Sequence, residues 1–337
     1  MKNKIYVIGV DIGGTNTKIG IVNEDGEIIL KEQIPTNPGI GIETCIDLIT
    51  KKISEILEQS IKLGILVSGI GLGVTGQVDI NTGKIVGGIK GKIPGWIGLP
   101  IKNIFEKKFN LPVSVDNDGN VAALAEYIFG MQDSVHSMVV LTIGTGIGCG
   151  IILDGKLFRG GGNNLSAELG HVSINVFGPI CPCGKKGCLE AYISKEAIIN
   201  MYKQKRLEVD KNNAERTSLS QKKEVISPEL IYQKHLEGEK IATEVIHQVG
   251  IYLGYTIANA VNTIGPEIVV VGGGIAQFNE PLLNSARKTV EANVFGLASR
   301  DMKIILAKFG TFAGVIGAST LVMEKFNHIT GIDNRIS

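Results

Sequence analysis

Asp11-Ile12-Gly13-Gly14-Thr15-Asn16-Thr17-Lys18 is the stretch of sequence that decides the fold. It follows the apolar run Ile5–Val10, and a second run rich in apolar residues, Lys18–Val22, resumes directly after it. Two strands joined by a glycine turn, with a further turn at Glu24-Asp25-Gly26, predict a hairpin at the start of an α/β fold. The small residues of the first turn leave backbone N–H groups free to surround phosphate oxygens.

The same pattern recurs about 130 residues later in the chain. Met138–Ile143 is an apolar run, Gly144-Thr145-Gly146-Ile147-Gly148 is a glycine turn, and Asp154-Gly155 is the hairpin turn that follows. Repetition of a strand, a loop and a hairpin predicts two related lobes with a cleft between them. We expect the lobes to span residues 1–130 and 131–337, because the helix that starts near Asp118 should end at Gly130.

The rest of the second lobe is expected to be largely helical. A third glycine turn, Gly272-Gly273-Gly274, follows a buried strand and is a candidate for the far side of a nucleotide site. The preceding stretch, Pro228–Thr263, is predicted to be one long helical region. Lys203–Ser227 is polar without apolar periodicity and is predicted to be an irregular surface connection. A last helix, about Ala313–Phe326, should pack back on the first lobe.

Composition excludes several classes of protein. The chain has 337 residues, enough for two domains, and its 34 Lys and Arg balance 33 Asp and Glu to a net charge of +1. No excess of positive charge exists to hold a polyanion, so we expect no nucleic-acid partner. The uncharged stretch 137–153 is too short for a membrane span and is interrupted by glycines. Without a signal-peptide pattern, we expect a cytoplasmic protein with no membrane partner.

The first glycine turn has a simpler interpretation as an ordinary hairpin turn. The recurrence of a similar glycine turn in the second half of the chain favours a pair of phosphate-binding loops instead. Neither loop has the G-x-x-x-x-G-K-[ST] spacing of a P-loop, and the nearest G-x-G-x-x-G spacing lacks the helix that a dinucleotide site needs. Both of those nucleotide-binding folds are therefore set aside.

A metal site is indicated by one histidine and three closely spaced cysteines. His171, Cys181, Cys183 and Cys188 offer one imidazole and three thiolates, the closed donor set of a structural zinc site. Gly184 and Gly187 bend the loop between the cysteines. The alternative is a group of free thiols, which three cysteines within eight residues make a poor explanation. Cys45 and Cys149 are expected to be buried thiols.

Taken together, these motifs closely resemble the ROK family of sugar kinases and sugar-responsive repressors, over nearly the whole chain. The segments that carry the resemblance are 11–16, 115–120, 144–150, 168–171, 181–190 and 271–274. The resemblance implies the α/β fold of actin, Hsp70 and hexokinase-like ATPases. It also implies that ATP with Mg²⁺ is bound by both glycine turns and by the third, through Asp11, Gly13, Gly14, Thr15, Asn16, Lys18, Gly144, Thr145, Gly146, Gly273 and Gly274.

Asp118 is the candidate catalytic residue. Taken alone, an Asp between a short strand and an alanine-rich helix is more often an N-cap. The resemblance implies instead that Asp118 is the general base that accepts the proton of the attacking sugar hydroxyl, and that Asn117 holds the sugar. Asp116 is expected to lie outside the site, as a solvated or capping residue.

The resemblance also implies a sugar pocket beside the zinc site. Glu168 and Glu190 match residues that bind sugar hydroxyls, His171 faces both metal and sugar, and the segment with Gly76 borders the pocket. Carboxylates that accept from vicinal hydroxyls can distinguish epimers. Family members often carry Asn before the Leu-Pro-Gly-Trp turn, whereas this chain has Lys92 before Ile93-Pro94-Gly95-Trp96.

The expected function is therefore an ATP-dependent sugar kinase that phosphorylates the 6-hydroxyl of a hexose, with glucose favoured. Other hexoses, such as fructose and allose, and the N-acetylated amino sugars remain alternatives. A sugar-responsive repressor is less favoured, because the first strand starts at Ile5 and leaves no room for a DNA-binding module. An actin-like or chaperone ATPase would have no use for the zinc site. Family resemblance also implies a homodimer.

Overall fold

The computed structural model describes residues 4–132, 134–161, 165, 167–212, 225–298 and 300–326, without the side chains of 210–212. The chain divides into two compact units. Unit 1 comprises Met1–Thr142, Gly148–Glu168 and Ala307–Ser337, and unit 2 comprises Ile143–Ile147 and Leu169–Leu306. The lobes expected at 1–130 and 131–337 are a different division of the chain and stay a prediction. The last helix, expected to return to the N-terminal lobe, lies in unit 1.

Unit 1 is built on a five-stranded sheet with the order β3-β2-β1-β4-β7. Its strands are β1 (Tyr6–Ile12), β2 (Asn16–Asn23), β3 (Ile28–Pro35), β4 (Val67–Val74) and β7 (Val113–Asn117). The first three form an antiparallel meander, and β4 and β7 continue the sheet in parallel. A two-stranded sheet of β5 (Gln77–Asp79) and β6 (Lys84–Gly87) follows β4.

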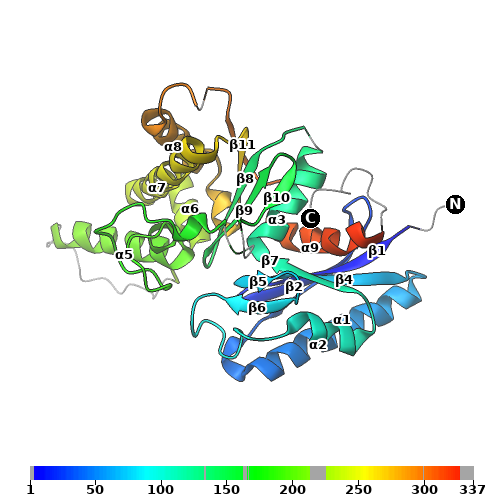
Figure 1. Ribbon diagram of the computed structural model, residues 1–337. Helices are drawn as coiled ribbons and strands as arrows, with labels where there is room; N and C mark the ends of the chain where they lie inside the picture. Colours follow the sequence, from blue (N-terminus) through cyan, green and yellow to red (C-terminus); the bar gives the residue numbers. More distant parts are fainter. Residues whose placement is uncertain are drawn as a thin grey trace. The chain divides into compact units, whose positions relative to one another are not determined.

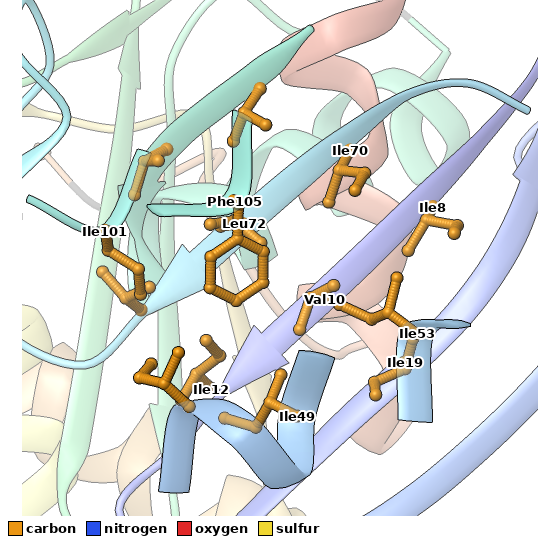
Figure 2. Packing of buried hydrophobic residues seen from close by; sticks show 14 of the residues in the cluster. Ile8, Val10, Ile12, Ile19, Ile49, Ile53, Ile70, Leu72, Ile101 and Phe105 are labelled. Carbon is orange, nitrogen blue, oxygen red and sulfur yellow. The ribbon is translucent and has the colours of Figure 1, made fainter. Parts of the chain in front are cut away.

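Helices cover both faces of this sheet (Figure 1). On one face lie α1 (Ile42–Lys62) and α2 (Ile101–Phe109). The helical spacing of Ile46, Ile49 and Ile53 buries one stripe of α1 against Ile8, Val10 and Ile12 of β1, which point to the same side of the strand. Figure 2 shows the side chains of α1 and β1 that it labels in the same core as Leu72 and Phe105.

The opposite face carries α3 (Asp118–Ala125) and α9 (Ala313–Met323), which contact each other. Helix α9 lies directly on β1 and β4, because a Cβ at Gly9 or Gly71 would overlap the carbonyl oxygens of Val315 or Ala318. Only glycine permits so close an approach of helix and strand backbones. The π-helical turn η2 (Glu126–Met131) extends α3.

The second sheet repeats the strand arrangement of the first. Its strands are β8 (Met138–Ile143), β9 (Ile147–Leu153), β10 (Lys156–Phe158), β11 (Ile268–Gly272) and β12 (Lys303–Leu306). The order β10-β9-β8-β11-β12 matches β3-β2-β1-β4-β7 position by position. The predicted α/β fold with an internal repeat of strand, glycine loop and hairpin is therefore confirmed.

Unit 2 holds the remaining helices. These are α4 (Glu190–Ile193), α5 (Lys195–Asn212), α6 (Pro228–Leu236), α7 (Lys240–Ile264) and α8 (Asn279–Asn293). Short helical turns lie at Pro38–Ile40, Leu169–His171, Gly274–Phe278, Gly310–Phe312 and Glu324–Phe326. None of the helices in the described part of the chain is both long and apolar enough to cross a membrane.

Two sequence-based expectations for this unit were wrong. Residues 203–212, expected to be irregular, form the second half of α5, and residues 213–224 lie outside the described residues. The predicted single helical region 228–263 is two helices, because Gly238 adopts a left-handed φ of 86° between them. Helices α7 and α8 then run side by side (Figure 1).

Candidate functional site

The junction of β7 and α3 places Asn117 and Asp118 at the edge of the first sheet. Asn117, not Asp118, is the N-cap of α3: its Oδ1 accepts from the N–H groups of Gly119 and Asn120 at 2.8 and 3.3 Å. Its Nδ2 donates to the carbonyl of Gly76 at 2.9 Å, so two of the predicted sugar-binding residues are joined directly. The capping interpretation of Asp118 is therefore wrong; its carboxylate is partly accessible, and its Oδ1 accepts from the N–H of Gly119 at 2.9 Å.

Asp118 and Asp11 are two partly accessible carboxylates surrounded largely by protein. Desolvation raises the pKa of Asp118 to about 6, while the charge of Lys92 and the N–H of Gly119 act in the lowering direction. Desolvation, with the nearby charge of Asp118, raises the pKa of Asp11 to about 7, and Lys18 opposes this. Two acids whose charges are held in a poorly solvated setting are typical of a site that moves protons or binds a cation.

The first glycine turn is fixed by its own backbone. The N–H of Gly13 donates to the carbonyl of Asn16 at 3.1 Å, and the hydroxyl of Thr36 donates to the carbonyl of Gly13 at 2.8 Å. Thr15 and Asn16 are exposed at the tip. Lys18, predicted to contact phosphate, donates from Nζ to the carbonyl of Thr311 at 2.6 Å. Its ammonium is therefore engaged with the segment before α9, although its charge still reaches Asp11.

The second glycine turn, in unit 2, is held from two sides. The N–H of Gly144 donates to the carbonyl of Gly146 at 2.9 Å, and the carbonyl of Gly144 accepts from the N–H of Lys195 at 2.8 Å. Gly273 packs against the backbone of Ile143 with a left-handed φ of 83°, and Gly274 faces open space. Unit 2 thus gathers Gly144, Gly146, Gly273 and Gly274 at one end of its strands.

The four predicted metal ligands come together. One donor atom from each of His171, Cys181, Cys183 and Cys188 lies within 4.8 Å of all the others. The separations from Cys181 Sγ to His171 Nδ1 and from Cys183 Sγ to Cys188 Sγ are both 3.7 Å. A tetrahedral zinc site with bonds of about 2.3 Å to sulfur has edges of about 3.8 Å. The cysteines are free thiols, so the donor set and the spacing both fit zinc.

Glu190 links this cluster to the second glycine turn. It is buried, its Oε2 accepts from the N–H of Ile147 at 2.8 Å, and its Oε1 lies 4.0 Å from Cys181 Sγ. Glu168 is half-buried and precedes the turn that carries His171. Within unit 2, Glu190 therefore connects the thiol cluster to the end of the second glycine turn.

Sequence reasoning missed a buried ion pair next to Asp118. Asp116 Oδ2 accepts from Nε and a terminal guanidinium nitrogen of Arg159 at 2.8 and 2.7 Å, and both side chains are buried. Asp116 Oδ1 accepts from the N–H of Asn117 and from Asn120 Nδ2. The expectation of a solvated or capping Asp116 is wrong, because its position within β7 turns the side chain inward.

Known proteins share this architecture. The profile of the ROK family matches residues 7–325. A glucokinase of Halalkalibacterium halodurans is 33% identical over 339 residues, covering 97% of each chain. A xylose repressor of Caldicellulosiruptor bescii is 32% identical over 325 residues, covering 94% of this chain and 78% of the repressor. The crystal structure of a ROK family glucokinase from Streptomyces griseus, in complex with glucose and AMPPNP, matches with a TM-score of 0.82 at 30% identity, covering 94% of this chain and 98% of that one.

Proposed function

Because the chain belongs to the ROK family and is a sugar kinase that uses ATP with Mg²⁺, we propose that it transfers the γ-phosphoryl group to the 6-hydroxyl of glucose. The observation that carries this proposal is the state of Asp118. Its carboxylate is accessible, is free of the helix cap, and has a pKa raised to about 6. Such a group is ionised at neutral pH and still basic enough to accept a hydroxyl proton.

In the proposed reaction, Asp118 takes the proton of the sugar hydroxyl as its oxygen attacks the γ-phosphorus. The new P–O bond forms while the bond to the β,γ-bridging oxygen breaks, and ADP leaves with that electron pair. Asn117 and the carbonyl of Gly76, already hydrogen-bonded to each other, hold the sugar beside the base. Positioning of this kind supplies much of the rate enhancement in phosphoryl transfer.

Binding of ATP is assigned to the three glycine turns. In unit 1 these residues are Asp11, Gly13, Gly14, Thr15, Asn16 and Lys18, and in unit 2 they are Gly144, Thr145, Gly146, Gly273 and Gly274. Asp11 fits the hydrated Mg²⁺ that accompanies ATP, because a desolvated carboxylate gains most from a nearby cation. Mg²⁺ would supply neutralisation of the phosphate charge.

Zinc is assigned to His171, Cys181, Cys183 and Cys188, where it would fix the loop that carries the sugar-binding residues. Glu168, Glu190 and His171 are proposed to bind sugar hydroxyls. Since Glu190 lies against Cys181, we expect removal of the metal by a chelator to weaken sugar binding before the whole chain unfolds. Calorimetric titration with glucose, before and after chelation and after zinc is restored, measures this; unchanged affinity in metal-free protein contradicts it.

The sugar itself is settled by an assay of ADP release over glucose, mannose, fructose, allose, N-acetylglucosamine and N-acetylmannosamine. We expect the highest kcat/KM for glucose. A higher kcat/KM for another sugar would replace glucose in the proposal. Release of ADP that occurs only when no sugar is present would overturn the proposed function. The homodimer and the cytoplasmic location stay predictions; light scattering of the purified protein measures the first.

A further inference from the structure

Lys92 lies over the first glycine turn. It belongs to the connection between β6 and α2, and its side chain is half-buried. A Cβ placed on Gly14 would stand 2.9 Å from Lys92 Cε and 3.7 Å from its Nζ. The stem of Lys92 therefore packs on Gly14, and its ammonium lies at the turn assigned above to the phosphates of ATP.

The loop that presents Lys92 is anchored. Trp96, four residues later, is buried, and its Nε1 donates to the carbonyl of Thr75 at 2.7 Å. The N–H of Lys92 itself donates to the carbonyl of Ile89 at 3.2 Å, which closes a turn. An anchored loop holds the start of the lysine side chain in place and lowers the entropy cost of a contact made by its ammonium.

The charge of Lys92 also acts on Asp118, whose pKa it lowers. Asp118 in turn acts on Asp11 of β1, which Lys18 of β2 also influences, while Asp116, two residues before Asp118, is paired with Arg159. Lys18 is hydrogen-bonded to Thr311. Among the described residues, nothing forms a hydrogen bond or an ion pair with the ammonium of Lys92. The Lys92 ammonium is thus a cation close to both the glycine turn and Asp118, and its N–H groups are available to a ligand.

We propose that the Lys92 ammonium contacts the phosphoryl group while it passes from ATP to the sugar hydroxyl. The inference rests on the proposed function and adds a residue to it. Lys92 would donate to the non-bridging oxygens, on which charge is spread in the transition state, and would neither gain nor lose a proton. Bond making, bond breaking and proton transfer to Asp118 remain as described above.

Substitution separates this role from simple packing. We expect Lys92→Met, which keeps the stem, to lower kcat about 10²-fold to 10³-fold while KM for the sugar changes less than about threefold. Lys92→Arg should recover part of the loss, because it restores the charge. Lys90→Met, at an exposed lysine two residues earlier, is the matched control and should behave as the wild type. A Lys92→Met enzyme within threefold of wild-type kcat would overturn the proposal.

A second measurement does not depend on kinase activity. Binding of inorganic tripolyphosphate with Mg²⁺ is followed by the fluorescence of Trp96, the single tryptophan of the chain. We expect the dissociation constant to rise at least tenfold in Lys92→Met; equal constants would overturn the inference. If the wild type phosphorylates no sugar, the proposed function fails and this binding test alone decides the role of Lys92. Lys92→Gln, checked for wild-type thermal unfolding, replaces Lys92→Met if that variant does not fold.

Discussion

Asp116 and Asp118 are two carboxylates only two residues apart, and the fold treats them in opposite ways. Asp116 is 2% exposed and is held by two guanidinium nitrogens of Arg159, by the N–H of Asn117 and by Asn120. Asp118 is partly accessible and accepts one close hydrogen bond, from the N–H of Gly119. The comparison teaches that the fold fixes one acid through an ion pair and hydrogen bonds and leaves the other partly accessible, as the proposed base has to be.

The reason lies in the backbone at this junction. Asp116 pairs with Gly73 inside the parallel ladder of β4 and β7, so its side chain must find partners in the interior. Asp118 is the first residue of α3, where the chain has left the ladder. A carboxylate near a helix N-terminus is stabilised by the macrodipole, so the site tolerates a charge without an ion pair.

The largest expected effect separates the two acids by activity. We expect Asp118→Asn to fold, to bind sugar and ATP, and to lose kcat by about 10²-fold to 10⁴-fold, because the amide cannot take the proton as the proposed base does. Steady-state kinetics with the preferred sugar measure the loss, and titration calorimetry checks binding. A variant that retains kcat within a few fold would remove Asp118 from the mechanism.

The next effect separates them by stability. Arg159→Met leaves Asp116 as a buried and unpaired charge, so the free energy of unfolding should fall by about 3–5 kcal/mol. Urea denaturation followed by circular dichroism measures it. The double variant Asp116→Asn with Arg159→Met should recover part of this loss, since no isolated charge remains. If the single variant is as stable as the wild type, the ion pair does not hold the junction.

Removing the charge of Asp118 should have a smaller effect on stability, and one that is stabilising where the loss of Arg159 is destabilising. Burial raises the pKa of Asp118 from 3.8 to about 6, so ionisation is disfavoured in the folded state and stability declines as pH rises through this window. We expect Asp118→Asn to raise the free energy of unfolding by about 1–3 kcal/mol at pH 7.5, with the gain lost by pH 4. Denaturation curves at the two pH values test this, and an equal gain at both would contradict the electrostatic explanation.

The smallest effect is the pH dependence of the wild type. A carboxylate accepts a proton only when ionised, and burial raises the pKa of Asp118 to about 6, so with Asp118 as the proposed base kcat/KM should fall about tenfold for each pH unit below 6. Rates between pH 5 and 8 measure it, with protein stability checked at each point. If kcat/KM stays constant down to pH 5, a group other than Asp118 determines the acidic side of the pH dependence.

Much of the fold was predictable because its signals are local. A glycine turn between two apolar runs, Gly13-Gly14, and its repeat at Gly144-Thr145-Gly146 define both hairpins of the sheets. The donor set of the thiol cluster was visible in the spacing of Cys181, Cys183 and Cys188. Each of these features depends on neighbours in sequence.

What could not be predicted depends on distant residues. Arg159 and Asp116 are 43 positions apart in the sequence, and no local pattern near either residue predicts that they form an ion pair. The hydrogen bond from the ammonium of Lys18 to the carbonyl of Thr311 joins residues 293 positions apart and has no local signal, while the predicted contact of Lys18 with phosphate stays a prediction. For Lys92, the sequence indicated only that the position departs from the pattern of the family it resembles. That departure does not predict what the Lys92 side chain contacts.

The seating of α9 on Gly9 and Gly71 has a consequence for biosynthesis. This helix is translated about 300 residues after β1, yet it covers one face of the sheet that β1 begins. During elongation the part of that face that α9 covers stays exposed after α3 has been made, until the C-terminal helix is translated. Unit 1 therefore completes its folding only late in synthesis, and until then the nascent chain needs protection from aggregation.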